Sequence, residues 1–286
     1  MEIQHFTKAS SGFPDYLRHI PNPPESLYVL GNTSALVDYP RLAVVGTRKM
    51  TSYGRSVTNQ LAGEAAGQGV VIISGLALGV DAIAHQAALD ASGMTVAVLA
   101  GGLDHITPTT NYRLAMRILE EGGAIVSEYP PGTPPMKNNF IARNRLVSGL
   151  ADGLLVTEAA VNSGTLHTVN FALDQGKTVM AVPGNINSPL SAGTNNLLRQ
   201  GAVPVTTAKD IMEALNIEPP EPHQIDLFAN DPAEATILKL LQGGSSTTGE
   251  LLINSKLGAR TFNQALTMLE ITGRIHSVGA GRWGFK

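Results

Sequence analysis

The residues best suited to chemistry form the stretch VNSGTLHT, at 161–168, between an apolar strand pattern and an apolar-periodic helix pattern. Small and hydroxylated residues at a strand-to-helix turn leave backbone N–H groups free, and the dipole of the following helix favours an anion there. The turn therefore predicts a phosphate cradle, formed by Asn162, Ser163, Gly164 and Thr165. The turn alone leaves open whether that phosphate belongs to a mononucleotide, a cofactor or a polymer.

A second candidate group combines cations with an aromatic ring in the stretch KNNFIARNR. Phe140 lies between Lys137 and Arg143, and Arg145 follows. Bases of a single strand stack on aromatic rings while cations contact the phosphates, so this pattern is typical of single-strand binding. The alternative interpretation is that Phe140 anchors the start of a helix to the core.

Two other phosphate-binding motifs are absent or incomplete. The sequence QGKT, at 175–178, lacks the earlier glycine of a P-loop, because position 171 is Phe171, and it follows a helix pattern rather than a strand. No G-x-G-x-x-G follows the first strand pattern, which argues against a dinucleotide site. Ser74 and Gly75 open the turn SGLALGVD, which is either a backbone cradle or a tight helix–strand contact.

Nothing in the sequence assembles a catalytic or metal site. The chain has no cysteine, which excludes disulfides and thiolate ligands. Its seven histidines are scattered, and no pair has ligand spacing beside carboxylates. Asp81 falls early in a helix pattern, where an acidic residue is usually a partner of the helix dipole. We therefore expect a binding protein rather than an enzyme, with no metal and no cofactor.

The elements that must position these residues alternate along the chain. Short β-branched runs begin near residues 42, 70, 95, 124, 153 and 178, and helical patterns separate them. Continuous apolar strands that alternate with helices indicate a parallel sheet covered on both faces. This predicts an α/β fold with a Rossmann-like, doubly wound, mostly parallel sheet. Ligands bind such sheets at the carboxyl ends of the strands, which places Arg48, in VGTRKM, on the same edge as the cradle.

The chain divides into four segments. The stretch NIEPPEPHQIDLFAND is rich in proline and acidic residues and predicts a linker. Three helix patterns and a short hairpin follow it, as in a winged-helix domain. The expected boundaries are a short N-terminal extension at 1–23, a Rossmann-like domain at 24–215, the linker at 216–231 and the winged helix at 232–286.

Composition bounds the class of protein. The chain has 286 residues, of which 43% are hydrophobic and 15% charged, as expected of a globular protein. No apolar run is long enough to cross a bilayer and no signal peptide precedes the first strand pattern, so we expect a cytoplasmic protein with no membrane partner. The net charge of −3 argues weakly against nucleic acid, although a global acidic balance can hide a local basic groove.

The motifs together closely resemble the DNA-processing protein A family, DprA, also called Smf. The resemblance covers about residues 24–206 and rests on many motifs in the right order: VVGTR, SGLALGVDAIAHQAAL, AGGLDHITP, SEYPPGTPP, NFIARNRLVSGLADGLLVTEAAVNSGTLHTVNFAL and VMAVPGNINSPLSAGTNNLLRQGA. The segment from residue 232 resembles the winged-helix domain that many members carry. About 23 residues precede the matched region, which leaves no room there for the helical domain found at that end of longer members.

The resemblance implies a protein that binds single-stranded DNA, protects incoming strands during natural transformation and loads RecA recombinase onto them, with no catalytic reaction of its own. It also implies a homodimer formed through the Rossmann-like domain. The family's DNA groove implies roles for Arg48, Lys137 and Phe140, with Ser74, Gly75 and the NSGT turn lining the same pocket.

A second resemblance supplies the alternative function. The NSGT turn is similar to the P-G-G-x-G-T-x-x-E motif of nucleoside-monophosphate phosphoribohydrolases. Gly164 and Thr165 match that motif, but Thr168 stands where its catalytic glutamate belongs. Without that carboxylate the hydrolytic mechanism lacks its acid–base group, so a nucleotide-binding protein of this type is the weaker hypothesis.

Overall fold

The computed structural model describes residues 2–217, 232–242, 247–272, 274–279 and 281–285. The chain forms two compact units, Met1–Pro219 and Pro220–Lys286, and each is described by itself. Most of the predicted linker lies outside the described residues.

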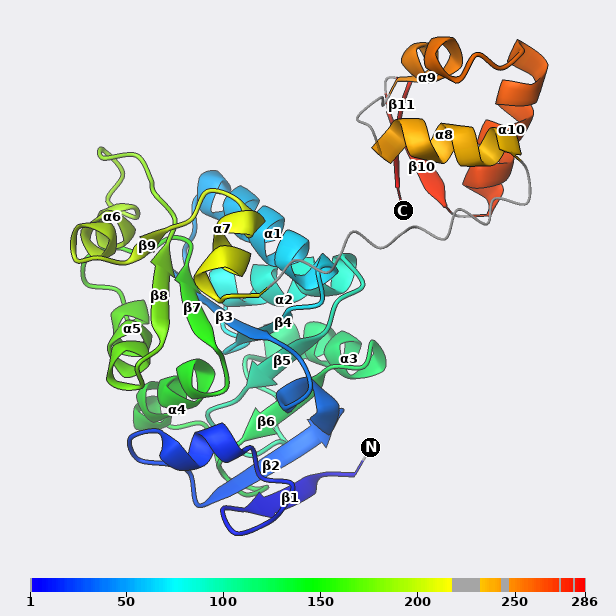
Figure 1. Ribbon diagram of the computed structural model, residues 1–286. Coiled ribbons are helices and arrows are strands. Elements are labelled where there is room, and N and C mark those ends of the chain that lie inside the picture. Colours follow the sequence, from blue (N-terminus) through cyan, green and yellow to red (C-terminus); the bar gives the residue numbers. More distant parts are fainter. Residues whose placement is uncertain (1, 218–231, 243–246, 273, 280, 286) are drawn as a thin grey trace. The chain divides into compact units, whose positions relative to one another are not determined.

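A nine-stranded sheet forms the centre of the first unit, in the order β1-β2-β6-β5-β4-β3-β7-β8-β9 (Figure 1). The strands β3 to β9 run parallel, and β2 pairs antiparallel with both β6 and β1. The strands are β1 Gln4–Thr7, β2 Ser26–Gly31, β3 Arg41–Val45, β4 Val71–Ser74, β5 Thr95–Val98, β6 Ala124–Ser127, β7 Gly153–Val156, β8 Thr178–Ala181 and β9 Val203–Pro204. The predicted Rossmann-like, mostly parallel sheet is confirmed, with its strand order reversing between β3 and β7.

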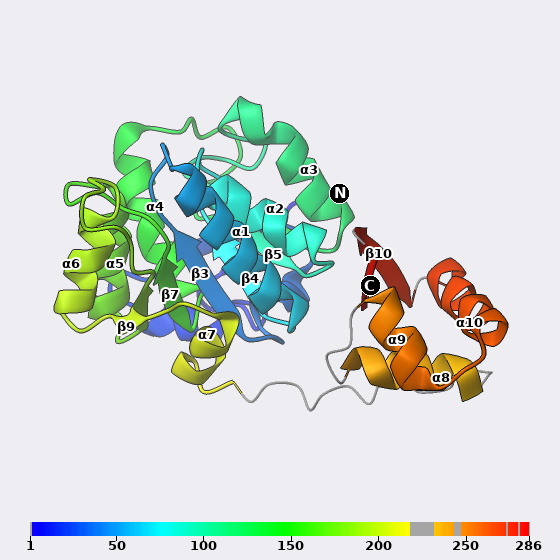
Figure 2. The same cartoon turned by 90° about the horizontal axis from the view of Figure 1, so that it is seen from above.

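Helices cover both faces of this sheet (Figures 1 and 2). One face packs against α4 (Lys137–Gly149), α5 (Thr165–Asp174), α6 (Ala192–Arg199) and the short 3₁₀ helices η1 (Asp15–His19) and η2 (Thr33–Leu36). The other packs against α1 (Ser52–Gly67), α2 (Val80–Asp90), α3 (Tyr112–Glu120), which follows η3 (Thr109–Asn111), and α7 (Ala208–Ala214). Successive residues of a strand point to opposite faces, so the buried runs of β3 to β7 supply side chains to both cores.

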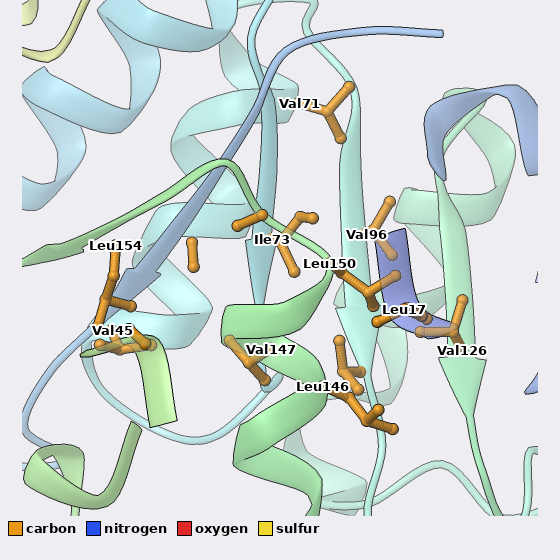
Figure 3. Close-up of a cluster of buried hydrophobic side chains, with 14 of the residues drawn as sticks. Leu17, Val45, Val71, Ile73, Val96, Val126, Leu146, Val147, Leu150 and Leu154 are labelled. Atoms are coloured by element: carbon orange, nitrogen blue, oxygen red, sulfur yellow. The ribbon is translucent and has the colours of Figure 1, made fainter. Parts of the chain in front are cut away.

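The helix α4 illustrates how the core fixes the elements of the site. Leu146 and Val147 of α4, and Leu150 directly after it, lie among strand side chains such as Val45 and Ile73 (Figure 3). All five side chains are at most 5% exposed. Because full burial of one aliphatic side chain stabilises by about 1.5–3 kcal/mol, this face of α4 is held firmly, and its first turn is carried to the carboxyl edge of the sheet.

The residues before position 24, expected as a short extension, contribute to the main sheet and core. Strand β1 pairs with β2 through Gln4–Val29 to Thr7–Ser26, and Leu17 of η1 is fully buried against α4. Strand β1 is short and mostly polar, and the apolar run LYVL of β2 is not followed by a helix pattern, so neither strand was predicted as part of the alternating sheet.

The second unit has three helices and a two-stranded antiparallel sheet, as predicted for a winged helix. Its elements are α8 Pro232–Gln242, α9 Thr248–Ser255, α10 Ala259–Ile271, β10 Ile275–Gly279 and β11 Arg282–Phe285. Its own apolar core is centred on Phe262, Leu269 and Ile237. Among all described residues of both units, no helix combines the length and apolar character needed to cross a membrane.

Candidate nucleic-acid interface

A cavity of about 430 Å³ opens at the carboxyl edge of the sheet, beside the β3–β7 junction where the strand order reverses. Loops after β3, β4 and β7 and the first half of α4 form its walls. The predicted site residues that line it are Arg48, Gly75, Phe140, Arg143, Ser163, Gly164 and Thr165. The fold therefore brings Arg48 together with the cradle at Ser163 to Thr165, which lies more than one hundred residues later in the chain.

The loop that carries Arg48 is fixed by neighbours on both sides. The Thr47 amide donates to the Glu158 carbonyl at 2.8 Å, and the Val80 amide donates to the Thr47 carbonyl at 3.2 Å. The Glu158 carboxylate, 1% exposed, accepts from the Thr51 amide at 2.8 Å and the Thr51 hydroxyl at 2.6 Å. Glu158 is a positioning residue that sequence reasoning missed, although it ends the strand pattern directly before the cradle.

The predicted cradle lies at the start of α5. Helix α5 begins after Gly164, which has no side chain to cap it. Open space surrounds the position that a Gly164 Cβ would occupy, so a ligand can approach the backbone closely. The Ser163 hydroxyl donates to the Thr165 hydroxyl at 2.9 Å and accepts from the Thr165 amide at 3.2 Å, which orders the turn. The amides of Thr165, Leu166 and His167 already donate to Ser163 and Gly164, so it is the dipole of α5 and the open approach to Gly164 that suit an anion.

Phe140 lies at the boundary between the cation and the cavity. Its ring is partly exposed and belongs to none of the buried core clusters of the described residues, which argues against the alternative role as a core anchor. The Arg48 guanidinium carbon lies 5.9 Å from the centroid of the Phe140 ring. A cation over a partly exposed aromatic ring places a phosphate contact beside a stacking surface.

Arg143 lines the cavity but is itself 4% exposed. Its guanidinium donates to the Gly75 carbonyl at 2.7 Å and to the Val98 carbonyl. The buried Asp81 carboxylate accepts from the amides of Gly75 and Ala77. Burial raises the pKa of Asp81 and the charge of Arg143 opposes that rise, while burial lowers the pKa of Arg143 to about 10. These two charges fix the loop after β4 beneath the cavity.

Four predicted site residues do not line the cavity. The Ser74 hydroxyl is buried and donates to the Val44 carbonyl at 2.7 Å. Arg145 forms a two-pronged ion pair with Glu128, with both N–O distances at 2.6 Å. Lys137 and Asn162 are exposed, on the first turn of α4 and in the loop before α5. The lining also includes Asn144, His167 and Thr168, which sequence reasoning did not place there.

Beneath this site, His85 of α2 predicts a pH-dependent stability. The ring is fully buried, its Nδ1 lies 2.6 Å from the Thr95 hydroxyl, and burial together with the Arg143 charge lowers the pKa of His85 to about 3. Below pH 6.5 the His85 ring binds a proton in the unfolded chain but stays neutral in the folded chain. The free energy of unfolding should therefore fall by about 1.4 kcal/mol from this residue for each pH unit below 6.5, until the folded pKa is reached.

Urea titrations of the wild type and of His85→Leu at pH 7.5, 6.5 and 5.5 measure this contribution. The variant should lose about 1 kcal/mol less than the wild type between pH 6.5 and 5.5, because half of the unfolded chains are already protonated at pH 6.5. Parallel pH profiles of the two proteins would contradict a neutral, buried His85.

A doubly wound sheet, with a cavity at its carboxyl edge that Arg48 and the start of α5 line, defines a Rossmann-like α/β protein whose cavity suits an anion. The chain belongs to the DNA recombination-mediator protein A family, whose model matches residues 4–216. This match is longer than the region of about 24–206 that the motifs cover, and at its N-terminal end it includes strand β1.

Several relatives support this assignment. The chain is 45% identical to protein Smf of Escherichia coli over 212 residues, which cover 74% of this chain and 56% of that protein. It is 40% identical to DNA processing protein DprA of Bacillus subtilis, over 75% of this chain and 73% of that protein. Over 96% of its length it is 39% identical to a putative DprA of Mycobacterium tuberculosis, of which it covers 72%.

Two solved structures share the fold. DprA of Streptococcus pneumoniae is 36% identical, with a TM-score of 0.69 and 74% of each chain covered. DprA of Helicobacter pylori is 35% identical, with a TM-score of 0.66, and the match covers 75% of this chain and 97% of that one. The H. pylori structure is described as giving insights into a single-stranded DNA binding mode.

Proposed function

We propose that this protein binds single-stranded DNA in the cavity at the carboxyl edge of its sheet. The observation that carries the proposal is the exposed Arg48 beside the partly exposed ring of Phe140, in one cavity with the start of α5. The cation and the start of α5 receive backbone phosphates, and the ring stacks a base. The family and the single-strand binding mode described for the H. pylori relative support the same function.

A nucleotide hydrolase is the weaker candidate. Thr168 lines the cavity at the position where that mechanism needs a carboxylate. Asp81 is the carboxylate among the described lining residues, and its oxygens already accept two backbone amides. We therefore infer that the protein acts by binding and not by catalysis. Release of free base from a nucleoside monophosphate, lost on changing Thr165, would favour the hydrolase.

Arg48→Ala and Phe140→Ala should weaken single-strand binding in different ways. Loss of Arg48 removes one phosphate contact, so affinity falls and the slope of log K against log salt flattens by about 0.7. Loss of the Phe140 ring should cost roughly 1–3 kcal/mol of binding free energy and leave that slope unchanged. Titrations of oligothymidylate at three or more salt concentrations separate the two effects.

Arg145→Met provides the matched contrast, because the Arg145 guanidinium is held by Glu128 outside the cavity. This variant should keep the wild-type salt slope, although loss of the ion pair lowers stability. A flattened slope in Arg145→Met and an unchanged slope in Arg48→Ala would refute the proposed groove.

We further propose that the protein acts in the cytoplasm, where it protects incoming DNA during natural transformation and loads RecA recombinase onto the bound strand. We also propose that it forms a homodimer through its first unit. The first unit carries every residue of the proposed site, so we propose that the fragment 1–217 binds DNA without the winged helix. Faster nucleation of RecA filaments on coated single strands and sedimentation of the fragment as a dimer are the tests.

A further inference from the structure

The loop after β4 contains a leucine in a backbone conformation that leucine seldom adopts. Leu76 has a φ of +57°, in the left-handed region, and is fully buried. The other non-glycine residues with positive φ in the described part of the chain are asparagines or follow helices: Asn22, Asn216, Ser92 and Lys256. Left-handed backbone is strained for a bulky side chain in a loop. Such strain persists only where the surroundings enforce it, and it clusters at binding sites.

Asn111, the last residue of η3, holds the carbonyl groups of this turn. Its Nδ2 donates to the Leu76 carbonyl at 2.8 Å and to the Ala77 carbonyl at 3.3 Å. The Leu76 side chain packs in a buried apolar cluster that includes Leu99 and Ile106. The turn is therefore fixed in two ways, by an amide donor on its carbonyls and by an anchor in the core.

The same turn leads directly to the proposed phosphate contact. Ala77 lines the cavity. Two residues later, Gly79 approaches the loop after β3 so closely that a Cβ on it would lie 2.6 Å from the Arg48 Cα. A change in the course of the chain at Leu76 would therefore move the segment against which the Arg48 loop packs.

We propose that Asn111 is a positioning residue for single-strand binding, which acts on Arg48 through the loop after β4. This inference rests on the proposed function and deepens it, because Asn111 does not line the cavity and yet sets the cation that does. Its two hydrogen bonds keep Leu76 in the left-handed region. Without them Leu76 relaxes to an unstrained φ, and the segment that ends at Gly79 moves away from Arg48.

The test titrates an oligothymidylate into the wild type, Asn111→Ala and Asn111→Asp at three or more salt concentrations. A carboxylate has the shape of the amide but no N–H, so both variants lose the two hydrogen bonds. The affinity of Asn111→Ala should fall about fivefold, as for the loss of one net hydrogen bond. The fall in Asn111→Asp should be at least as large, because its carboxylate repels the two carbonyls. In both variants the salt slope should flatten toward that of Arg48→Ala.

Asn32→Asp is the matched control. The Asn32 Nδ2 donates to the Gly122 carbonyl at 3.2 Å, beside the first residue pair of β2 and β6 at the amino edge of the sheet. The substitution makes the same chemical change to the same kind of contact, away from the cavity. It should lower the melting temperature and leave the affinity and the salt slope as in the wild type.

A double-mutant cycle determines whether Asn111 acts through Arg48. In an Arg48→Ala background, Asn111→Ala should change the affinity by no more than about twofold, the scatter expected of independent sites. Asn111→Ser, whose hydroxyl can still donate to one carbonyl, should restore part of the affinity in the Arg48 background. A purely structural role would lower the melting temperature in both backgrounds and leave the salt slope unchanged.

The outcomes separate this inference from the proposed function. An equally large fall in affinity in the Arg48→Ala background would overturn it, because Asn111 would then act on another contact. Wild-type affinity and slope in the folded Asn111 variants would overturn it as well, and so would unfolding of every Asn111 variant, which would show a role in the fold as a whole. Failure of the wild type to bind the strand would refute the proposed function, and this inference with it.

Discussion

Replacing Arg143 with leucine should lower the free energy of unfolding by about 3–5 kcal/mol, the range found when one member of a buried charged pair is removed. The guanidinium is 4% exposed and donates to the carbonyls of Gly75 and Val98. Its loss leaves these carbonyls unpaired and leaves the buried Asp81 carboxylate without the charge that offsets its burial. The loop after β4 then loses its support, so DNA binding should weaken as well.

The pH dependence identifies the cause of that loss. Without Arg143 the pKa of Asp81 rises further, so the folded variant takes up a proton more readily than the unfolded chain. Its stability gap to the wild type should therefore narrow as the pH falls. Asp81→Asn provides the matched background, in which Arg143→Leu should cost about half as much because no charge remains uncompensated. Equal costs in both backgrounds would contradict the coupling of these two residues.

Replacing Gly79 with alanine should lower the free energy of unfolding by about 2–6 kcal/mol and should also weaken DNA binding. Gly79 has a φ of +84°, and a Cβ there would lie 2.3 Å from the Thr47 carbonyl oxygen and 2.6 Å from the Arg48 Cα. Left-handed strain and overpacking each contribute roughly 1–3 kcal/mol. The neighbour that must move carries the proposed phosphate-binding cation.

Gly176→Ala separates strain from displacement. Gly176 also has a positive φ, +67°, but no heavy atom lies within 4 Å of the position of its Cβ. This variant should lose only about 1–2 kcal/mol and bind DNA as the wild type does. Denaturant titrations and strand binding on both variants decide the matter. Wild-type affinity in a folded Gly79→Ala protein would show that the position of Arg48 does not depend on this contact.

Much of the fold could be predicted because buried parallel strands have a recognisable sequence pattern. Strands β3 to β8 are buried on both faces and appear as continuous apolar runs, and the helices between them have one apolar face. Strands β1 and β9 could not be predicted in this way, because short edge strands carry few apolar residues and depend on a neighbour that sequence periodicity does not reveal. The short helices α6 and α7 were not predicted either, because they too have few apolar residues of their own.

The site was predicted less completely, for a physical reason. The carboxyl-edge rule brings Arg48, Phe140 and the NSGT turn to one place, and the structure puts Arg48, Phe140 and the last three residues of that turn around one cavity. The rule says nothing about which cations are already paired. Arg143 and Arg145 look equivalent in sequence, yet one holds carbonyls beneath the cavity and the other holds Glu128. Burial and partners depend on contacts between distant segments.

The hydrogen bonds around the Arg48 loop also affect how fast a single strand associates. Thr47 is joined to Glu158 of the loop after β7 and to Val80 of α2, so the loops after β3, β4 and β7 are held in place by the chain itself. A groove that is already assembled needs no slow rearrangement before it accepts a ligand. Association of the strand should then proceed in a single kinetic phase. Attraction between the strand and Arg48 should accelerate it at low ionic strength, and differences in affinity should lie mainly in the dissociation rate.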